Sequence, residues 1–152
     1  KAIGMERCHS LEEMLPQCLF VSVHTPLTPK TKHIMNDASL ALLPKGAYLV
    51  NTARGPCVSG DAVVRALESG QLAYAALDVV EKEPLDDERL RKHPKVLLTP
   101  HSAFYSVEGF IEMRRKGAEE VRRLVLDQPV VNLVNGHCLT NPRFKLPLSN
   151  LS

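Results

Sequence analysis

The sequence predicts an α/β fold with a doubly wound parallel sheet, and three observations favour it. Short apolar runs alternate with segments of helical periodicity along most of the chain. The runs are nearly continuous in apolar character, which is typical of parallel strands that are covered on both faces. The alternation of strand and helix is the order that builds right-handed βαβ units. With 152 residues, 44% of them hydrophobic, the chain is long enough to bury one core.

Four strands are predicted from short apolar runs that are bounded by turn residues. They are residues 19–23, 47–50, 73–80 and 96–98. The third run is almost wholly apolar, as a strand that is covered on both faces would be. The prolines and glycines between the runs place turns where parallel strands need connections.

Helices are predicted between and after these strands. The first covers residues 10–17, and the second is a short helix that Asn36 or Asp37 caps and that runs through Leu43. The third begins at Ser59 and ends before Gly70, and the fourth is a long amphipathic helix over residues 106–126. In the long helix, the spacing predicts that Glu112 pairs with Lys116 and that Glu119 pairs with Arg123.

Composition excludes several classes of function. The net charge is only +2, and basic and acidic residues are mixed along the chain, so neither a nucleic-acid surface nor an electrostatic membrane anchor is expected. No apolar stretch approaches the roughly 20 residues that cross a bilayer. The four cysteines form no CxxC pair, and the six histidines show no metal-ligand spacing, so no metal is assigned. We expect a soluble, cytoplasmic protein with a small-molecule partner.

Three polar residues follow the predicted strands. Arg54 follows the second strand, Glu83 follows the third, and His101 follows the fourth. Because parallel strands end at the same edge of a sheet, where open α/β folds bind ligands, we expect these residues to lie close together. An arginine binds a carboxylate through two hydrogen bonds. An imidazole titrates near neutrality and can act as an acid or base, which a neighbouring carboxylate would orient.

Each of these residues also has a purely structural explanation. An arginine before Gly-Pro is ordinarily a solvated turn residue, and Glu-Pro is ordinarily the start of a loop. A histidine after Thr-Pro is more often a loop or capping residue than a catalyst. Glu81 competes with Glu83 for the carboxylate role, and residue types alone do not choose between them. The three motifs together favour a functional site.

In their order and separations, these motifs resemble the D-isomer-specific 2-hydroxyacid dehydrogenases. The resemblance covers roughly residues 10–132, and it is carried by residues 51–55 (Asn-Thr-Ala-Arg-Gly), 76–84 (Ala-Leu-Asp-Val-Val-Glu-Lys-Glu-Pro) and 98–103 (Leu-Thr-Pro-His-Ser-Ala). It implies a Rossmann-like sheet and an oxidoreductase that transfers a hydride between NAD(H) and a D-2-hydroxy acid and 2-oxo acid pair. It also implies a homodimer in the full-length protein.

The resemblance also assigns roles to single residues. It implies that Arg54 anchors the substrate, that His101 is the acid/base, and that Glu83, through the family's Glu-Pro pattern, is its partner in place of Glu81. Asp78 is a further functional candidate, because a carboxylate inside an apolar strand is costly unless something pairs with it. The cofactor contacts that the resemblance implies are His24, Thr25, Thr52, Ala53, Arg54, Asp78 and His101.

The sequence is expected to hold only the C-terminal part of an NAD-binding domain. A complete dinucleotide site needs a glycine-rich turn for the pyrophosphate, and no GxGxxG occurs in the chain. Residues 1–132 are therefore expected to be part of that domain, without its glycine-rich half and inactive on their own. Residues 133–152 lack sustained periodicity and are expected to be an irregular tail. The residues that choose between NAD and NADP normally lie in the missing half, so the sequence leaves this choice open.

Two other functions are kept as alternatives. Residues 100–106 and 111–114 look most like the C-terminal binding protein branch of the family, although Phe104 stands where that branch usually has Trp. This similarity implies an NAD(H)-responsive, corepressor-like binding scaffold. A decayed fragment without nucleotide affinity is the third alternative.

Overall fold

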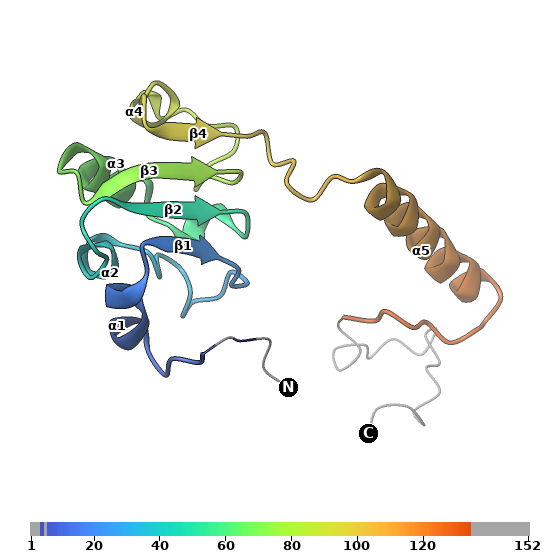
Figure 1. Ribbon diagram of the computed structural model, residues 1–152. Helices are drawn as coiled ribbons and strands as arrows, with labels where there is room; N and C mark the ends of the chain where they lie inside the picture. The colour runs from blue at the N-terminus through green and yellow to red at the C-terminus, as the bar shows by residue number, and fades with distance from the viewer. Residues whose placement is uncertain (1–3, 5, 135–152) are drawn as a thin grey trace. The chain divides into compact units, whose positions relative to one another are not determined.

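The computed structural model describes residue 4 and residues 6–134, and it confirms the predicted α/β fold with a parallel sheet (Figure 1). The four strands are β1 (Phe20–Val23), β2 (Ala47–Asn51), β3 (Leu72–Leu77) and β4 (Val96–Leu98). They form one sheet in the order β1-β2-β3-β4, and each is parallel to the next. Since every strand pairs with its successor, the carboxyl ends of all four lie along one edge.

Helical segments precede, connect and follow the strands. They are α1 (Leu11–Met14), a 3-10 turn (Leu15–Gln17), α2 (Asp37–Ala41), a second 3-10 turn (Gly55–Cys57), α3 (Gly60–Glu68), α4 (Glu88–Arg91) and α5 (Val107–Val125). Asn36, and not Asp37, caps α2, because its side chain accepts from the amides of Ala38 and Ser39. The sequence did not predict α4, which is too short to show helical periodicity.

The hydrophobic core lies between one face of the sheet and the helical segments that come before α5. Alternate strand residues such as Val21, Leu49 and Ala75 are buried in one cluster with Val63 and Leu67 of α3. This alternation follows from strand geometry, in which successive side chains point to opposite faces. The helices therefore hold the strands in place and fix the edge where the strands end.

The opposite face of the sheet carries a row of aromatic residues, of which the first and the last are exposed. Phe20, Tyr48 and Tyr74 stack across β1, β2 and β3, with ring centroids 4.6 and 6.1 Å apart. Tyr74 is 53% exposed and Leu97 is 64% exposed. The prediction that the third apolar run is covered on both faces was therefore wrong for the residues that the structure describes. An apolar run indicates a strand, but it does not show which of its residues are buried.

The contacts divide the chain into two compact units, residues 1–103 and 104–152. The sheet lies in the first unit. Of the predicted tail, residues 135–152 lie outside the described part of the chain, and the boundary at residue 132 stays a prediction. Along the described part, no helix is both long enough and apolar enough to span a bilayer.

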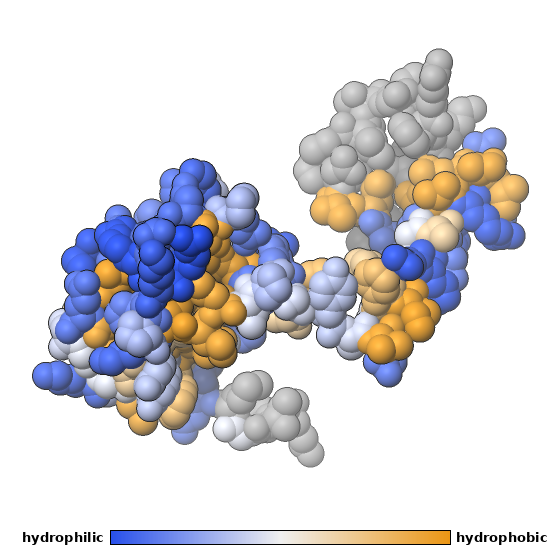
Figure 2. Space-filling model, turned by 90° about the horizontal axis from the view of Figure 1, so that it is seen from above, coloured by the Kyte–Doolittle hydropathy of each residue, from blue (hydrophilic) through white to orange (hydrophobic). Residues whose placement is uncertain are grey.

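The described part of the second unit is dominated by α5, which carries exposed apolar side chains (Figure 2). The predicted Glu112–Lys116 pair is confirmed at 2.6 Å. Glu119 instead pairs with Arg115 at 2.5 Å, so the predicted pair with Arg123 was wrong. A glutamate on a helix reaches a partner one turn away in either direction, and spacing does not choose between the two.

Candidate active site

The sequence-predicted polar residues lie beyond the carboxyl ends of three neighbouring strands. Arg54 follows β2, Asp78 follows β3 directly, and His101 follows β4 after a short turn. The backbone amide of Asp78 donates to the carbonyl of Asn51, and that of Thr99 donates to the carbonyl of Leu77. These hydrogen bonds continue the sheet one residue past the strands, so the three segments leave the sheet side by side.

Glu83 and His101 form a direct pair. The Nδ1 atom of His101 lies 3.0 Å from Oε2 of Glu83. The other carboxylate oxygen accepts from the amide of Val80 at 3.4 Å. The hydrogen bond from His101 lowers the pKa of Glu83, and although partial burial opposes this, the Val80 amide adds to the lowering. Glu83 is therefore ionised at neutral pH and orients the imidazole through Nδ1.

Asp78 holds the loop that carries His101. Its buried carboxylate accepts hydrogen bonds from the Thr99 hydroxyl at 2.5 Å, the Ser102 amide at 2.8 Å and the Ala103 amide at 3.0 Å. Burial by itself raises the pKa of Asp78, but the three hydrogen bonds together outweigh burial and leave the pKa below its ordinary value. These donors supply the pairing that a buried carboxylate needs. Its predicted contact with the cofactor stays a prediction.

His101 has an uncommon backbone conformation. Its φ angle is +52°, in the left-handed region, which costs a residue other than glycine about 1–3 kcal/mol. Its amide donates to the carbonyl oxygens of Asp78 and Thr99, each at 3.0 Å. The surrounding hydrogen bonds thus hold His101 in a conformation that a free chain would rarely adopt. Such strained backbone conformations are frequent at functional sites.

Asn51 shapes the turn that carries Arg54. It is fully buried, its side-chain oxygen accepts from the Ala53 amide at 3.1 Å, and its side-chain nitrogen donates to the Arg54 carbonyl at 3.0 Å. The guanidinium of Arg54 itself donates to the Ala53 carbonyl at 2.7 Å. Sequence reasoning missed Asn51. The available signal was a polar residue on the covered face of a strand, in step with Ala47 and Leu49.

The predicted site residues line two hollows. The first, of about 610 Å³, is lined by His24, Thr25, Pro26, Leu27, Thr52, Ala53 and Arg54. The second, of about 310 Å³, is lined by Asp78, Val80, Glu83, Pro84, Leu85, Leu98, Thr99, Pro100 and His101. The structure therefore brings the predicted acid/base pair together with Asp78. Arg54 lines the other hollow with the remaining predicted cofactor residues, and its predicted closeness to Glu83 and His101 stays a prediction.

The first hollow has the chemistry that a nucleotide cofactor needs. The hydroxyls of Thr25 and Thr52 can donate to or accept from ribose and amide groups, and Arg54 supplies a positive charge. Thr25 is held by a hydrogen bond from its hydroxyl to the Cys57 sulfur at 3.6 Å, and the His24 ring lies 2.8 Å from the Ser22 hydroxyl. A largely pre-formed hollow with a few placed polar groups is typical of cofactor sites. The donor set therefore fits the nicotinamide end of NAD(H).

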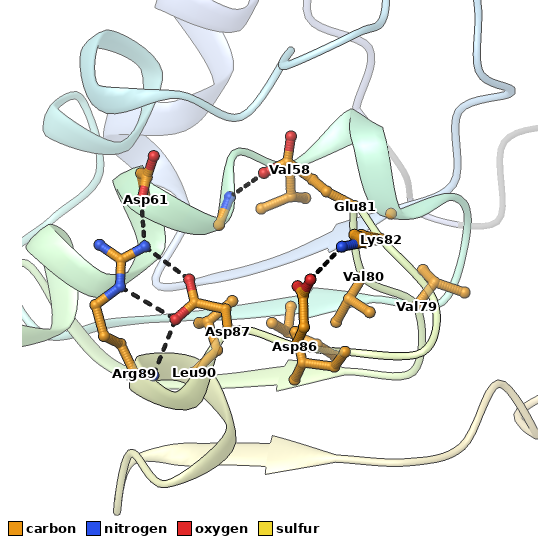
Figure 3. A pocket seen from close by; sticks show the side chains of 14 residues that line it. Val58, Asp61, Val79, Val80, Glu81, Lys82, Asp86, Asp87, Arg89 and Leu90 are labelled. Atoms are coloured by element: carbon orange, nitrogen blue, oxygen red, sulfur yellow. Dashed lines mark hydrogen bonds and ion pairs between the residues drawn. The ribbon is translucent and has the colours of Figure 1, made fainter.

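Glu81 has a different set of contacts from Glu83. Its Oε2 atom accepts from the amide of Gly60, the first residue of α3, at 2.8 Å (Figure 3). Its Oε1 atom lies 2.5 Å from Nε2 of His33. The structure thus pairs His101 with Glu83 and directs Glu81 to α3 and His33. Sequence reasoning missed His33, which carries no local signal and meets Glu81 only through the fold.

Comparison with known proteins identifies relatives over most of the chain. Residues 1–103 match the family model of the D-isomer specific 2-hydroxyacid dehydrogenase, NAD binding domain. The chain is 38% identical over 144 residues to D-3-phosphoglycerate dehydrogenase from Bacillus subtilis (strain 168). That match covers 95% of this chain and 27% of the relative.

Solved structures of similar proteins share the fold. The holo form of D-mandelate dehydrogenase from Rhodotorula graminis is 38% identical, with a TM-score of 0.77 over 83% of this chain and 37% of that one. A D-isomer specific 2-hydroxyacid dehydrogenase from Xanthobacter autotrophicus Py2, in complex with NADPH and MES, is 40% identical. Its TM-score is 0.70, over 82% of this chain and 51% of that one.

Proposed function

This chain belongs to the D-isomer specific 2-hydroxyacid dehydrogenase family, and we propose that it supplies the acid/base pair and the substrate-binding cation for NAD-dependent reduction of a 2-oxo acid. The single observation that carries the proposal is the hydrogen bond between Glu83 and His101. It joins an ionised carboxylate to an imidazole on a loop that Asp78 holds in place. Such a carboxylate and histidine pair is a common acid/base arrangement.

The proposed chemistry uses each residue at a stated atom. Arg54 binds the carboxylate of the 2-oxo acid through two hydrogen bonds and holds the substrate in place. When the carbonyl carbon gains a hydride, its oxygen becomes an alkoxide, and His101 gives this oxygen a proton, so that the 2-hydroxy acid forms. Glu83 stabilises the imidazolium before the transfer and fixes the ring through Nδ1. In the reverse direction His101 takes the proton back.

NAD(H) is the cofactor that fits the first hollow. We expect Thr25, Thr52 and the backbone at Ala53 to hold its nicotinamide end, with His24 beside them. When bound as NADH, it supplies the hydride. A solved relative is in complex with NADPH, whereas the matching family model is an NAD binding domain, and from that model we propose NAD for this chain.

Two properties of the whole protein are proposed from the family alone. We propose that it is a homodimer and that it acts in the cytoplasm. Light scattering coupled to size-exclusion chromatography tests the first, because it gives the mass in solution. Imaging of a fluorescent fusion tests the second.

The experiment that tests the proposed function is an NADH oxidation assay. The sequence lacks a GxGxxG turn, so we expect turnover from the full reading frame that encodes this segment and not from the 152-residue chain by itself. The substrates are glyoxylate, 3-phosphohydroxypyruvate and phenylglyoxylate, which are a small, a phosphorylated and an aromatic 2-oxo acid. Turnover with one of them would support the proposal and identify the substrate class.

Two variants connect turnover to the site. His101→Ala should abolish turnover while NADH binding stays largely intact, because the imidazole serves proton transfer. His9→Ala, which changes an exposed histidine before α1, should leave both unchanged. Full activity of His101→Ala would contradict the assignment. Tight NADH binding without any turnover in the parent protein would favour the corepressor-like scaffold.

A further inference from the structure

A second histidine and carboxylate pair, His33 and Glu81, lies in the unit that carries the candidate active site, and the proposed reaction does not use it. Its two side chains come from segments far apart in the sequence, the loop after β1 and the loop after β3. Glu81 lies only two residues before Glu83. Anything that fixes the position of Glu81 therefore bears on where Glu83 is held.

The loop after β3 is not held by close packing alone. Val80, Glu81 and Lys82 line a hollow of about 210 Å³, whose other lining residues include Gly60 of α3 and Leu90 of α4 (Figure 3). Close packing normally fixes a segment, and a hollow removes contacts on one side of it. On the side that faces the hollow, the loop therefore depends on specific polar contacts.

Glu81 makes such contacts in two directions. One oxygen accepts from the Gly60 amide at 2.8 Å, where the free amides of the first turn of α3 favour a negative charge. The other oxygen contacts Nε2 of His33. Glu81 thus ties the loop both to α3 and to the segment that follows β1.

His33 is itself anchored by its backbone. Its amide donates to the carbonyl of Pro56 at 2.8 Å, and its carbonyl accepts from the side chain of Asn36 at 2.9 Å. Its φ angle is +51°, in the left-handed region, so these contacts hold a conformation that few residues adopt. Pro56 lies in the 3-10 turn directly after Arg54. His33 therefore connects the turn that carries Arg54 to the loop that carries Glu83.

We propose that Glu81 and His33 are positioning residues, which brace the loop after β3 so that Glu83 meets Nδ1 of His101. Their relevance to catalysis rests on the proposed function, whereas their effect on the Glu83–His101 contact does not. Neither residue takes part in proton transfer. We call the contacts of Glu81 with the Gly60 amide and with His33 the brace. Without the brace, the loop can move over the hollow, and the distance between Glu83 and His101 increases.

The test follows the titration of the Glu83 carboxyl carbon by carbon-13 NMR in the 152-residue chain. The hydrogen bond from His101 lowers the pKa of Glu83, so loosening that bond should raise it. Glu81→Ala removes the brace and should raise the pKa of Glu83. Deleting a nearby negative charge by itself would lower this pKa, so a rise is diagnostic of lost positioning.

Glu81→Gln is the matched control. It removes the same charge, but its amide oxygen can still accept from Gly60 and its amide nitrogen can donate to a neutral His33 ring. We therefore expect it to keep the pKa of Glu83 below the value in Glu81→Ala. His33→Ala breaks the brace from the other side and should act like Glu81→Ala. His101→Ala gives the upper limit for the pKa of Glu83, because it removes the hydrogen bond between the two side chains altogether.

The outcomes separate this inference from the proposed function. Equal Glu83 titrations in Glu81→Ala, Glu81→Gln and the parent chain, with a clear rise in His101→Ala, would overturn the brace. In the full reading frame, we expect Glu81→Ala to lower kcat by on the order of tenfold while KM for the 2-oxo acid stays nearly constant. Absence of turnover in the parent protein would contradict the proposed function and leave the NMR result standing.

Discussion

Gly55 packs directly against the backbone of Val80. A β-carbon on Gly55 would lie 1.8 Å from the carbonyl oxygen of Val80, a distance that no pair of non-bonded atoms tolerates. Gly55 begins the 3-10 turn after Arg54, and Val80 lies in the loop that leads from β3 to Glu83. The two loops that carry these residues therefore meet at a point where only a hydrogen atom fits.

Gly55→Ala should destabilise the fold. The new methyl group meets backbone atoms, which cannot rotate away, so we expect the free energy of unfolding to fall by about 1–3 kcal/mol. Urea unfolding followed by circular dichroism measures this change. Gly117→Ala, in open space on α5, is the control and should cause no loss. Equal stability of the two variants would show that the loops separate easily at this point.

Asp78→Asn should weaken the loop that carries His101. The carboxylate accepts from three donors, and an asparagine would turn its NH₂ group toward at least one of them. We expect a loss of about 1–3 kcal/mol in the free energy of unfolding. Asp86→Asn, which changes an exposed carboxylate paired with Lys82, should cost far less. Equal effects of the two substitutions would contradict the structural role of Asp78.

The stability of the chain should depend on the ionisation of Asp78 in acid. Its pKa is lower in the folded chain than the value of about 3.9 that an unfolded aspartate shows. Ionised Asp78 thus contributes stability that is fully present above that value and is lost as pH falls through the folded pKa. Urea unfolding can be measured at neutral pH and at pH values below the unfolded pKa. The free energy of unfolding should fall less on acidification for Asp78→Asn than for the parent chain. An equal fall in the two proteins would show that other carboxylates cause the loss of stability in acid.

The sheet and the edge that carries the candidate site could be predicted because they rest on local patterns. Apolar runs mark the strands, and the chain order fixes which ends meet. The third strand ends at Leu77 rather than at Val80, although Val79, in the loop beyond the strand, is also buried. An apolar run therefore does not show where strand pairing stops.

The contacts between loops could not be predicted from local patterns. The choice of Glu83 over Glu81 needed the family resemblance, and the structure supplies the physical reason, which is that each carboxylate has its own histidine. His33 meets Glu81 from a distant segment, so no spacing rule reveals the pair. The structural role of Asn51 could have been predicted from the sequence, since a polar side chain on a covered face requires a buried partner.

Arg54→Lys should weaken binding of the 2-oxo acid more than binding of NADH. A lysine offers a point charge and cannot form the two parallel hydrogen bonds of a guanidinium. The loss of one charged hydrogen bond predicts an increase of roughly tenfold or more in KM for the 2-oxo acid. The measurement is initial rates of NADH oxidation by the full reading frame, with each substrate varied in turn.

Arg91→Lys is the matched control for this prediction. Arg91 lies on α4, where its guanidinium pairs with Glu88 on the surface, so its replacement should leave both KM values unchanged. The turn that carries Arg54 is fixed by the buried Asn51, so the lysine variant should keep the backbone of the site intact. An unchanged KM in Arg54→Lys would mean that charge alone binds the substrate carboxylate. An equal rise in KM for NADH would instead show that Arg54 contributes as much to cofactor binding as to substrate binding.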